Sequence, residues 1–161
     1  ITPTSDFTFY IAMFFSSLII LTFQLAVLFS GLFFIVKIPL SILLLRVILI
    51  LFLSASTFIS LGMFIGYIFR SEETALLVSI SGILLFMFFS NTILPIETVS
   101  GILQKYVVYN PLVVSDSMLK KVILFDLGLG SLKSEIYVLL GTLGIFFVLA
   151  FLARKVTKRF V

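Results

Sequence analysis

The chain has 161 residues, of which 61% are hydrophobic and 11% are charged, whereas a soluble domain has about 45–50% apolar and about 25% charged residues. Such a composition, with 20 phenylalanines and a mean hydropathy of +1.34, indicates that lipid surrounds most side chains. The absence of Cys and His excludes zinc clusters, thiol nucleophiles, haem ligation and Ser–His triads, and the net charge of +4 does not indicate nucleic-acid binding, because the basic residues lie between apolar blocks.

The first two predicted elements are membrane spans over residues 7–36 and 41–69. Residues 7–36 carry no charge, and about 20 helical residues cross a hydrocarbon core of roughly 30 Å. Lys37 and Pro39 end this span, because a charge prefers the membrane interface and proline is disfavoured inside a helix. Arg46 lies near the start of the second span, where its guanidinium group can reach the lipid headgroups.

A charged cytoplasmic turn is predicted after the second span. Its members are Arg70, Glu72 and Glu73. Ser71 is the expected N-cap of the next helix, and the two carboxylates fall in its first turn, where they interact favourably with the helix dipole. The third span is predicted over residues 74–90, because Asn91 and Pro95 end the regular helix.

Residues 91–131 are predicted to form a re-entrant or interfacial segment of short helices between the third and fourth spans. Polar, glycine and proline residues interrupt the apolar pattern here, and no run is long enough to cross a membrane. Two short helices fit the segment. The first covers Glu97 to about Val108, and the second has Asn110 as its N-cap and Pro111 at its first helical position.

The fourth span is predicted over residues 132–153, so that residues 1–161 form a single all-α integral membrane domain with four transmembrane helices. Basic residues follow the last span directly, at positions 154, 155, 158 and 159. Because short cytoplasmic flanks carry the excess of Lys and Arg, we expect a multi-pass protein of the cell membrane with both termini in the cytoplasm and the segment 91–131 outside.

A face of small side chains on the second span has two interpretations. Gly62 and Gly66 are four residues apart, Ala55 lies on the same helix face, and Ser56 and Ser60 are adjacent, a spacing that lets two helix backbones approach closely. The face either packs against another helix of this chain, or forms a dimer seam or a surface that slides during a conformational change. A non-catalytic scaffold or accessory subunit would use the same face to hold a partner.

The acidic residues do not indicate an enzyme. All seven lie in loops or near helix ends, where they are expected to cap helices or anchor them at the interface. A membrane enzyme would need a polar cluster assembled from Asp116, Asp126 and Glu135. The sequence also lacks the Gly-x-x-x-x-Gly-Lys-[Ser/Thr] phosphate loop, so ATP would have to bind another polypeptide.

Several local strings, in their order along the chain, resemble the permeases of ATP-binding-cassette exporters with the type-2 membrane domain. The strongest is Phe88-Phe89-Ser90-Asn91-Thr92-Ile93-Leu94-Pro95-Ile96-Glu97, which is similar to the break after the family's fifth span. Asn110-Pro111-Leu112 is similar to a string that follows that break. The other matching strings are Thr2–Ser5, Ser60–Met63 and Arg70–Ala75.

This resemblance implies a fragment of a longer protein, since the family has six spans preceded by a cytoplasmic connecting helix and this chain would supply the last four. It implies two permease copies, identical or related, around a central path, with ABC ATPase subunits docked from the cytoplasm. No cofactor is expected in this chain, because ATP and Mg²⁺ belong to the ATPase. The expected function is export of an amphipathic, lipid-like or peptide substrate.

The resemblance also implies an external gate. The segment from Pro95 to Asn110 would form re-entrant helices that cap the path on the outside, with Asn91, Glu97 and Pro111 as further gate residues. Glu97 would either cap the helix that begins near it or contact the cargo.

Overall fold

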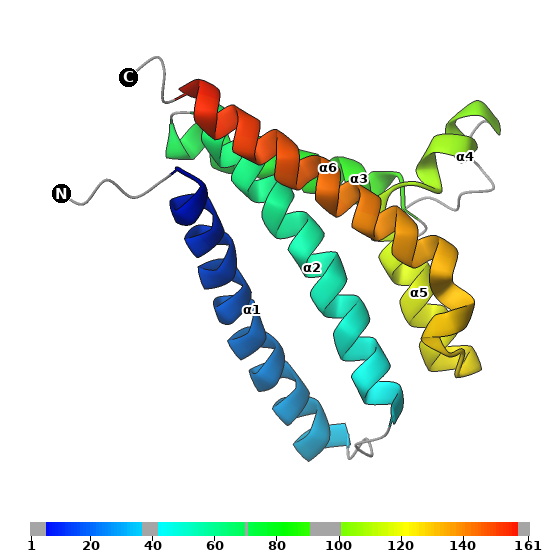
Figure 1. Cartoon of the computed structure of the whole chain (residues 1–161). Helices are drawn as coiled ribbons and strands as arrows, with labels where there is room; N and C mark the ends of the chain where they lie inside the picture. The colour runs from blue at the N-terminus through cyan, green and yellow to red at the C-terminus, as the bar shows by residue number, and fades with distance from the viewer. Residues whose placement is uncertain (1–5, 37–41, 70, 91–100, 158–161) are drawn as a thin grey trace.

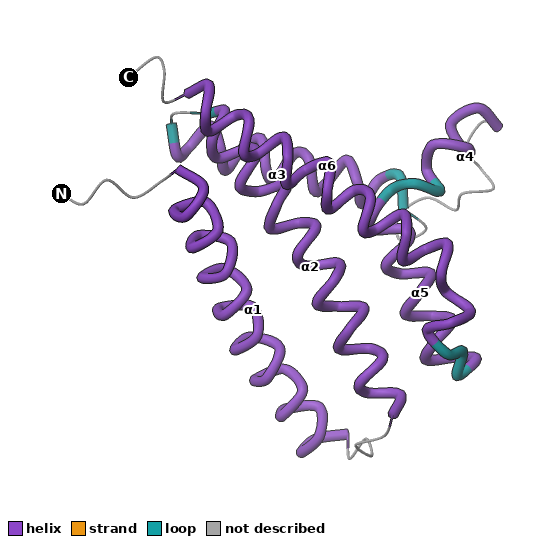
Figure 2. The backbone as a smooth tube through the Cα atoms, in the orientation of Figure 1, coloured by secondary structure: helices purple, strands orange, loops and turns teal. Residues whose placement is uncertain are grey.

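Every regular element that the computed structural model describes is a helix (Figure 2). The described residues are 6–36, 42–69, 71–90 and 101–157. The elements are α1 (Asp6–Val36), α2 (Ile42–Ile68), α3 (Glu72–Phe88), α4 (Gly101–Val107), α5 (Pro111–Phe125), the short 3₁₀ helix η2 (Leu129–Leu132) and α6 (Lys133–Thr157).

Three of these helices have the length and apolarity to cross a membrane, counting only the described residues: Phe7–Gly31 in α1, Leu43–Ile68 in α2, and Leu129–Val156 covering η2 and α6. The protein is therefore an all-helical, multi-pass integral membrane protein. The bounds of α1 and α2 agree with the predicted spans to within a residue. Helix α6 continues beyond the predicted end at residue 153, because Arg154 and Lys155 occupy its last turn, where positive charges interact favourably with the helix dipole.

Helix α3 has the same length as the span predicted over residues 74–90, but it starts and ends two residues earlier. Ser71 is its N-cap by backbone conformation, although the side chain makes no capping hydrogen bond. The helix ends at Phe88, and the backbone N–H of Ser90 donates to the Met87 carbonyl in a tighter final turn. Its 17 residues extend about 25 Å, and none of them is buried against the described remainder of the chain.

The core lies where α2, α5 and α6 meet. Buried residues of α2 recur at spacings of three and four, and Val47 and Ile50 join Met118 and Val122 of α5 in this cluster. The cluster is completed by Val114, Leu132 and Leu139. This spacing places a continuous stripe of α2 against its two neighbours.

Farther along α2, the stripe changes from aliphatic to hydroxyl side chains. Ser54, Thr57 and Ser60 are buried, and each hydroxyl donates to the carbonyl oxygen four residues earlier. Because these bonds satisfy the hydroxyls within the helix, the small side chains allow close helix packing without leaving unpaired polar groups.

Helix α1 makes its most buried contact near its N-terminal end and diverges from α2 beyond it (Figure 1), although Phe29 farther along still packs against the core cluster. Tyr10 is fully buried. Its hydroxyl donates to the Phe147 carbonyl oxygen at 2.9 Å, and its ring packs edge-on against Phe147 and Phe151 of α6. Most large side chains farther along α1, such as Phe23, are exposed, so lipid or another protein must cover them.

Candidate functional site at a break between two helices

Two short helices, α3 and α5, together follow the course of a single long helix beside α2. Helix α3 starts just after α2 ends, so it begins at that end of the molecule. Asp126, the residue after the last of α5, has its carboxylate oxygen 2.8 Å from the guanidinium nitrogen of Arg46 near the start of α2. The pair therefore extends from one end of α2 to the other, with α4 inserted at the break (Figure 1).

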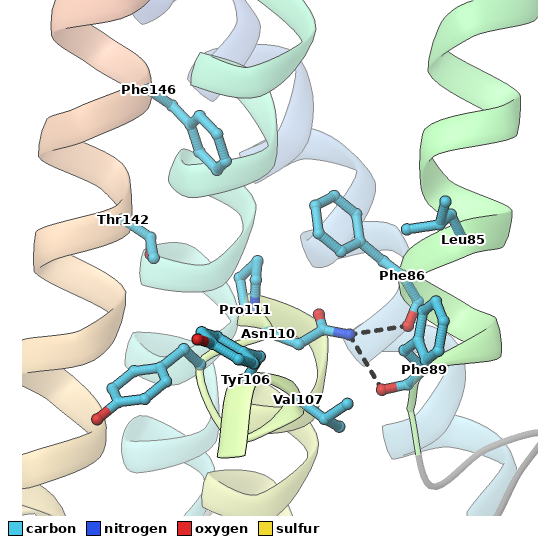
Figure 3. A pocket seen from close by; sticks show the side chains of 10 residues that line it. Leu85, Phe86, Phe89, Tyr106, Val107, Asn110, Pro111, Thr142 and Phe146 are labelled. Carbon is cyan, nitrogen blue, oxygen red and sulfur yellow. Dashed lines mark hydrogen bonds between the residues drawn. The ribbon is translucent and has the colours of Figure 1, made fainter. Parts of the chain in front are cut away.

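One side chain, that of Asn110, binds both helix ends at this break (Figure 3). Its Nδ2 donates to the carbonyl oxygens of Phe86 at 2.9 Å and Phe89 at 3.3 Å, at the end of α3. Its Oδ1 accepts a hydrogen bond from the backbone N–H of Leu112 at 3.0 Å, in the first turn of α5. A helix end leaves backbone groups without partners, and this amide supplies partners to both ends at once.

The predicted roles of Asn110 and Pro111 in starting a helix are confirmed. Asn110 is the N-cap of α5, and Pro111 follows at the start of the helix, where its missing N–H costs no hydrogen bond. The bonds to α3 were not predicted. No local sequence signal reports them, because their acceptors lie 24 and 21 residues away along the chain.

A cavity of about 340 Å³ opens at the break. Its wall comes from the end of α3, the α4–α5 turn and the middle of α6, where Thr142 and Phe146 project toward it (Figure 3). The lining residues are Leu85, Phe86, Phe89, Tyr106, Val107, Tyr109, Asn110, Pro111, Thr142 and Phe146. Thr142 is about 14 Å along α6 from its first residue, so the cavity lies near the middle of the helix rather than at an end.

The far end of α5 is fixed by ion pairs. Asp126 has a left-handed backbone conformation with φ 47°, which ends α5 and brings its carboxylate to Arg46. Lys121 binds Glu135 at the start of α6. Lys120 binds Asp116 one turn earlier, at 2.6 Å.

These pairs bear on the enzyme interpretation. Asp116 and Glu135 line one groove of about 400 Å³, each paired with a lysine, whereas Asp126 pairs with Arg46 and does not line that groove. Within the described ranges there is also no group of three metal-ligating side chains. Arg46, which was expected near the headgroups, binds the exposed carboxylate of Asp126 at the end of α5.

The glycine face of α2 is open. A Cβ built on Gly62 or Gly66 would meet no atom within 4 Å, and both residues line a groove of about 410 Å³ with Met13 and Tyr67. Ala55 is half-buried. In the described part of the chain, α2 buries the face that carries Ser54, Thr57 and Ser60, whereas the glycines face Met13 of α1 across this groove. Their role toward a partner stays a prediction.

Two other predicted site residues lie away from the break. Glu72 and Glu73 are exposed in the first turn of α3, at the opposite end of that helix. Arg70, Asn91, Pro95 and Glu97 lie outside the described residues, as does the predicted start of the first short helix, whose described part ends at Val107.

The fold and this site define a class of protein: a multi-pass helical membrane protein in which one side chain, that of Asn110, joins the ends of two short helices. The sequence model of the ABC-2 type transporter family matches residues 2–124. This range is most of the chain and contains α1, α2, α3, α4 and all but the last residue of α5. The chain therefore belongs to the ABC-2 type transporter family, as a membrane permease component of an ABC transporter.

The family assignment makes the chain a transport subunit that is not itself catalytic, and it implies an ABC ATPase partner and a membrane-embedded dimer. Comparison with curated proteins gave no match, and comparison with solved structures gave none.

Proposed function

We propose that this chain forms the last four spans of a six-span permease that exports an amphipathic, lipid-like or peptide substrate. A second permease copy would line the path, and a separate ATPase subunit would bind ATP and Mg²⁺. The observation that carries the proposal is the family match over residues 2–124, which includes the broken helix closed by Asn110.

In this proposal α1, α2 and α6 each cross the membrane, and α3 and α5 together make the remaining crossing. Helix α3 enters from the cytoplasmic side and ends within the bilayer, and the segment 91–131 returns to the external surface through α5. The hydrogen bonds of Asn110 support this arrangement, because a broken helix is tolerated at membrane depth only where protein or a cavity satisfies its backbone.

The break is then the external gate. The Asn110 side chain links α3 to α5 by hydrogen bonds, whereas α5 is held to α2 and α6 by buried packing and ion pairs. Closure of the ATPase subunits on ATP would tilt α3, and the separation of α3 from α5 would open the path. Asn91, Pro95, Glu97 and Pro111 belong to the same gate in this proposal.

Co-purification and ATPase coupling test the proposed function. The intact permease, with whatever precedes Ile1, is expected to elute with an ABC ATPase whose hydrolysis rate changes when the permease is present. Asn110→Asp is expected to uncouple the two, so that hydrolysis continues while substrate efflux from vesicles falls. An intact protein that binds no ATPase would overturn the proposal.

A scaffold or accessory subunit is the alternative function, and the open glycine face of α2 favours it. Because a Cβ at Gly62 meets nothing within 4 Å, Gly62→Leu is expected to leave the fold intact. If that variant loses a co-purifying membrane partner while ATPase coupling is unchanged, the scaffold function is supported. Val148→Leu, on an exposed part of α6, is the matched control.

A further inference from the structure

We infer that the cavity at the break binds a hydrocarbon chain, so that the permease holds the tail of a lipid-like amphiphile between α3, the α4–α5 turn and α6. The inference rests on the proposed function only in placing the cavity at membrane depth. Its ligand is defined by the chemistry of the wall, and it is distinct from any transport path between two permease copies.

Apart from the two tyrosines at the rim, the polar side chains of the wall already have hydrogen-bond partners. Both ends of the Asn110 amide are bonded to backbone groups, and the Thr142 hydroxyl donates to the Val138 carbonyl oxygen at 3.0 Å. The backbone N–H of Asn110 donates to the Val107 carbonyl oxygen. A peptide segment in this space would leave its own N–H and C=O groups unpaired, at a cost of several kcal/mol per group in hydrocarbon, whereas an alkyl chain has no such groups.

The remaining surface fits a chain of methylene groups. Leu85, Phe86 and Phe89 approach from α3, and Phe146 approaches from α6 (Figure 3). The cavity of about 340 Å³ is at the lower end of the range of small-molecule sites, which are lined mainly by apolar and aromatic side chains. Burial of alkyl area against these rings is favourable because it replaces loose lipid contacts with close packing.

A polar rim gives the site its orientation. Tyr106 and Tyr109 both border the cavity, and they are 72% and 62% exposed. Such tyrosines present a ring to the chain and a hydroxyl group to the headgroup side. The ligand is therefore an amphiphile whose tail enters beside Phe146 and whose polar group stays near these hydroxyls.

Tryptophan fluorescence can test this directly, because the 161 residues contain no Trp. Phe146→Trp places a reporter in the cavity, and Phe23→Trp places a control on the exposed surface of α1. The intact permease is reconstituted in nanodiscs with increasing mole fractions of brominated dodecyl maltoside or, in a second arm, of a phospholipid with brominated acyl chains. Signals are taken as differences from the parent protein.

We expect quenching at position 146 to saturate at a mole fraction about tenfold below that at position 23, a preference of about 1.4 kcal/mol. Unbrominated dodecyl maltoside should reverse the quenching at position 146 by competing for the cavity, and maltose, which has no alkyl chain, should not. Saturation in the detergent arm alone identifies a single-chain amphiphile, and saturation in both arms identifies bilayer lipid; each supports a hydrocarbon occupant.

Thr142→Phe in the reporter background is expected to remove the saturable phase by filling the cavity, while Thr142→Val, which only removes the hydroxyl, should keep it. The inference would be overturned if quenching at positions 146 and 23 rose equally with the mole fraction of brominated amphiphile. So would a complete lack of quenching at position 146, which would mean that protein covers the cavity. The quenching assay contains no ATPase subunit, so its result does not depend on ATPase coupling. If quenching saturates but the separate coupling experiment fails, only the proposed function is overturned.

Discussion

At the scale of single residues, Asn110 replaces the backbone partners that two helix ends lack. The end of α3 leaves carbonyl oxygens and the start of α5 leaves N–H groups, and hydrocarbon offers no water to either. The amide side chain carries both a donor and an acceptor, which Ser, Asp and Thr cannot supply in the same geometry. Pro111 reduces the demand further, since it has no N–H.

Asn110→Asp separates the two functions of this side chain. The carboxylate can still accept from the Leu112 N–H, but it cannot donate to Phe86 and Phe89, so we expect a loss of about 1–3 kcal/mol in unfolding free energy. Asn110→Ala should lose the N-cap as well, at about 0.5–2 kcal/mol more. Far-UV circular dichroism of the permease during SDS titration measures both, with the exposed Val108→Ala as control. Equal stability of Asn110→Asp and the parent would contradict the described geometry.

Tyr10→Phe tests the attachment of α1. The substitution removes the hydrogen bond to the Phe147 carbonyl and keeps the ring contacts, so we expect a loss of about 1 kcal/mol and faster proteolysis near the α1–α2 connection. Tyr137→Phe, at an exposed position of α6, is the control for removing a tyrosine hydroxyl. An unchanged cleavage rate would show that the ring packing alone holds α1.

At the scale of elements, α5 is the piece that joins the break to the core. Its buried residues recur at spacings of three and four, among them Val114, Met118 and Val122. Its opposite face carries the charged residues Asp116 and Lys120. This helix is therefore amphipathic in the manner of a surface helix, although it packs between two spans at one end of the molecule.

Met118→Ala is expected to destabilise the bundle by about 2–5 kcal/mol, because the side chain is fully buried and its removal leaves a cavity between α2, α5 and α6. Ile123→Ala, on the exposed face of the same helix, is expected to cost much less. SDS unfolding compares the two variants. Similar losses would mean that α5 is not packed in the described orientation.

The two ion pairs that fix α5 are expected to differ in strength. Asp126 is 77% exposed in its pair with Arg46, so Arg46→Met should cost about 0–1 kcal/mol. Glu135 is only 16% exposed, so Lys121→Met leaves a largely buried carboxylate without its main partner and should cost about 1–3 kcal/mol. The same unfolding assay ranks them, and the reverse order would contradict the burial of Glu135.

At the scale of the whole molecule, α2, α5 and α6 form the packed unit, and α1 and α3 lie at its margin. The predicted orientation places the α2–α3 turn in the cytoplasm and the α5–α6 connection outside. Since the sequence contains no Cys, Ser71→Cys and Ser131→Cys, both at exposed positions, provide single labelling sites.

An impermeant maleimide added to intact cells is expected to label Ser131→Cys directly and Ser71→Cys only after permeabilisation. The physical reason is the concentration of basic residues at the C-terminal end of α6, which stays in the cytoplasm. The unsubstituted permease is the control for background labelling. Labelling of Ser71→Cys in intact cells would reverse the topology.

The sequence by itself determined the membrane class, the bounds of α1 and α2, and the start of α5. Long uncharged apolar runs can be stable only in lipid, and their length sets the span. An Asn-Pro pair starts a helix through local backbone chemistry, so Asn110 and Pro111 could be placed from their neighbours alone.

Only the tertiary structure decided which helix faces meet, because spans that are apolar all round carry no periodic signal for their packed side. It closed the break with bonds from Asn110 to residues more than 20 positions earlier. It also paired Arg46 with Asp126 across 80 residues, and left Gly62 and Gly66 open while Ser54, Thr57 and Ser60 packed. Each depends on how distant segments dock, which a local pattern does not encode.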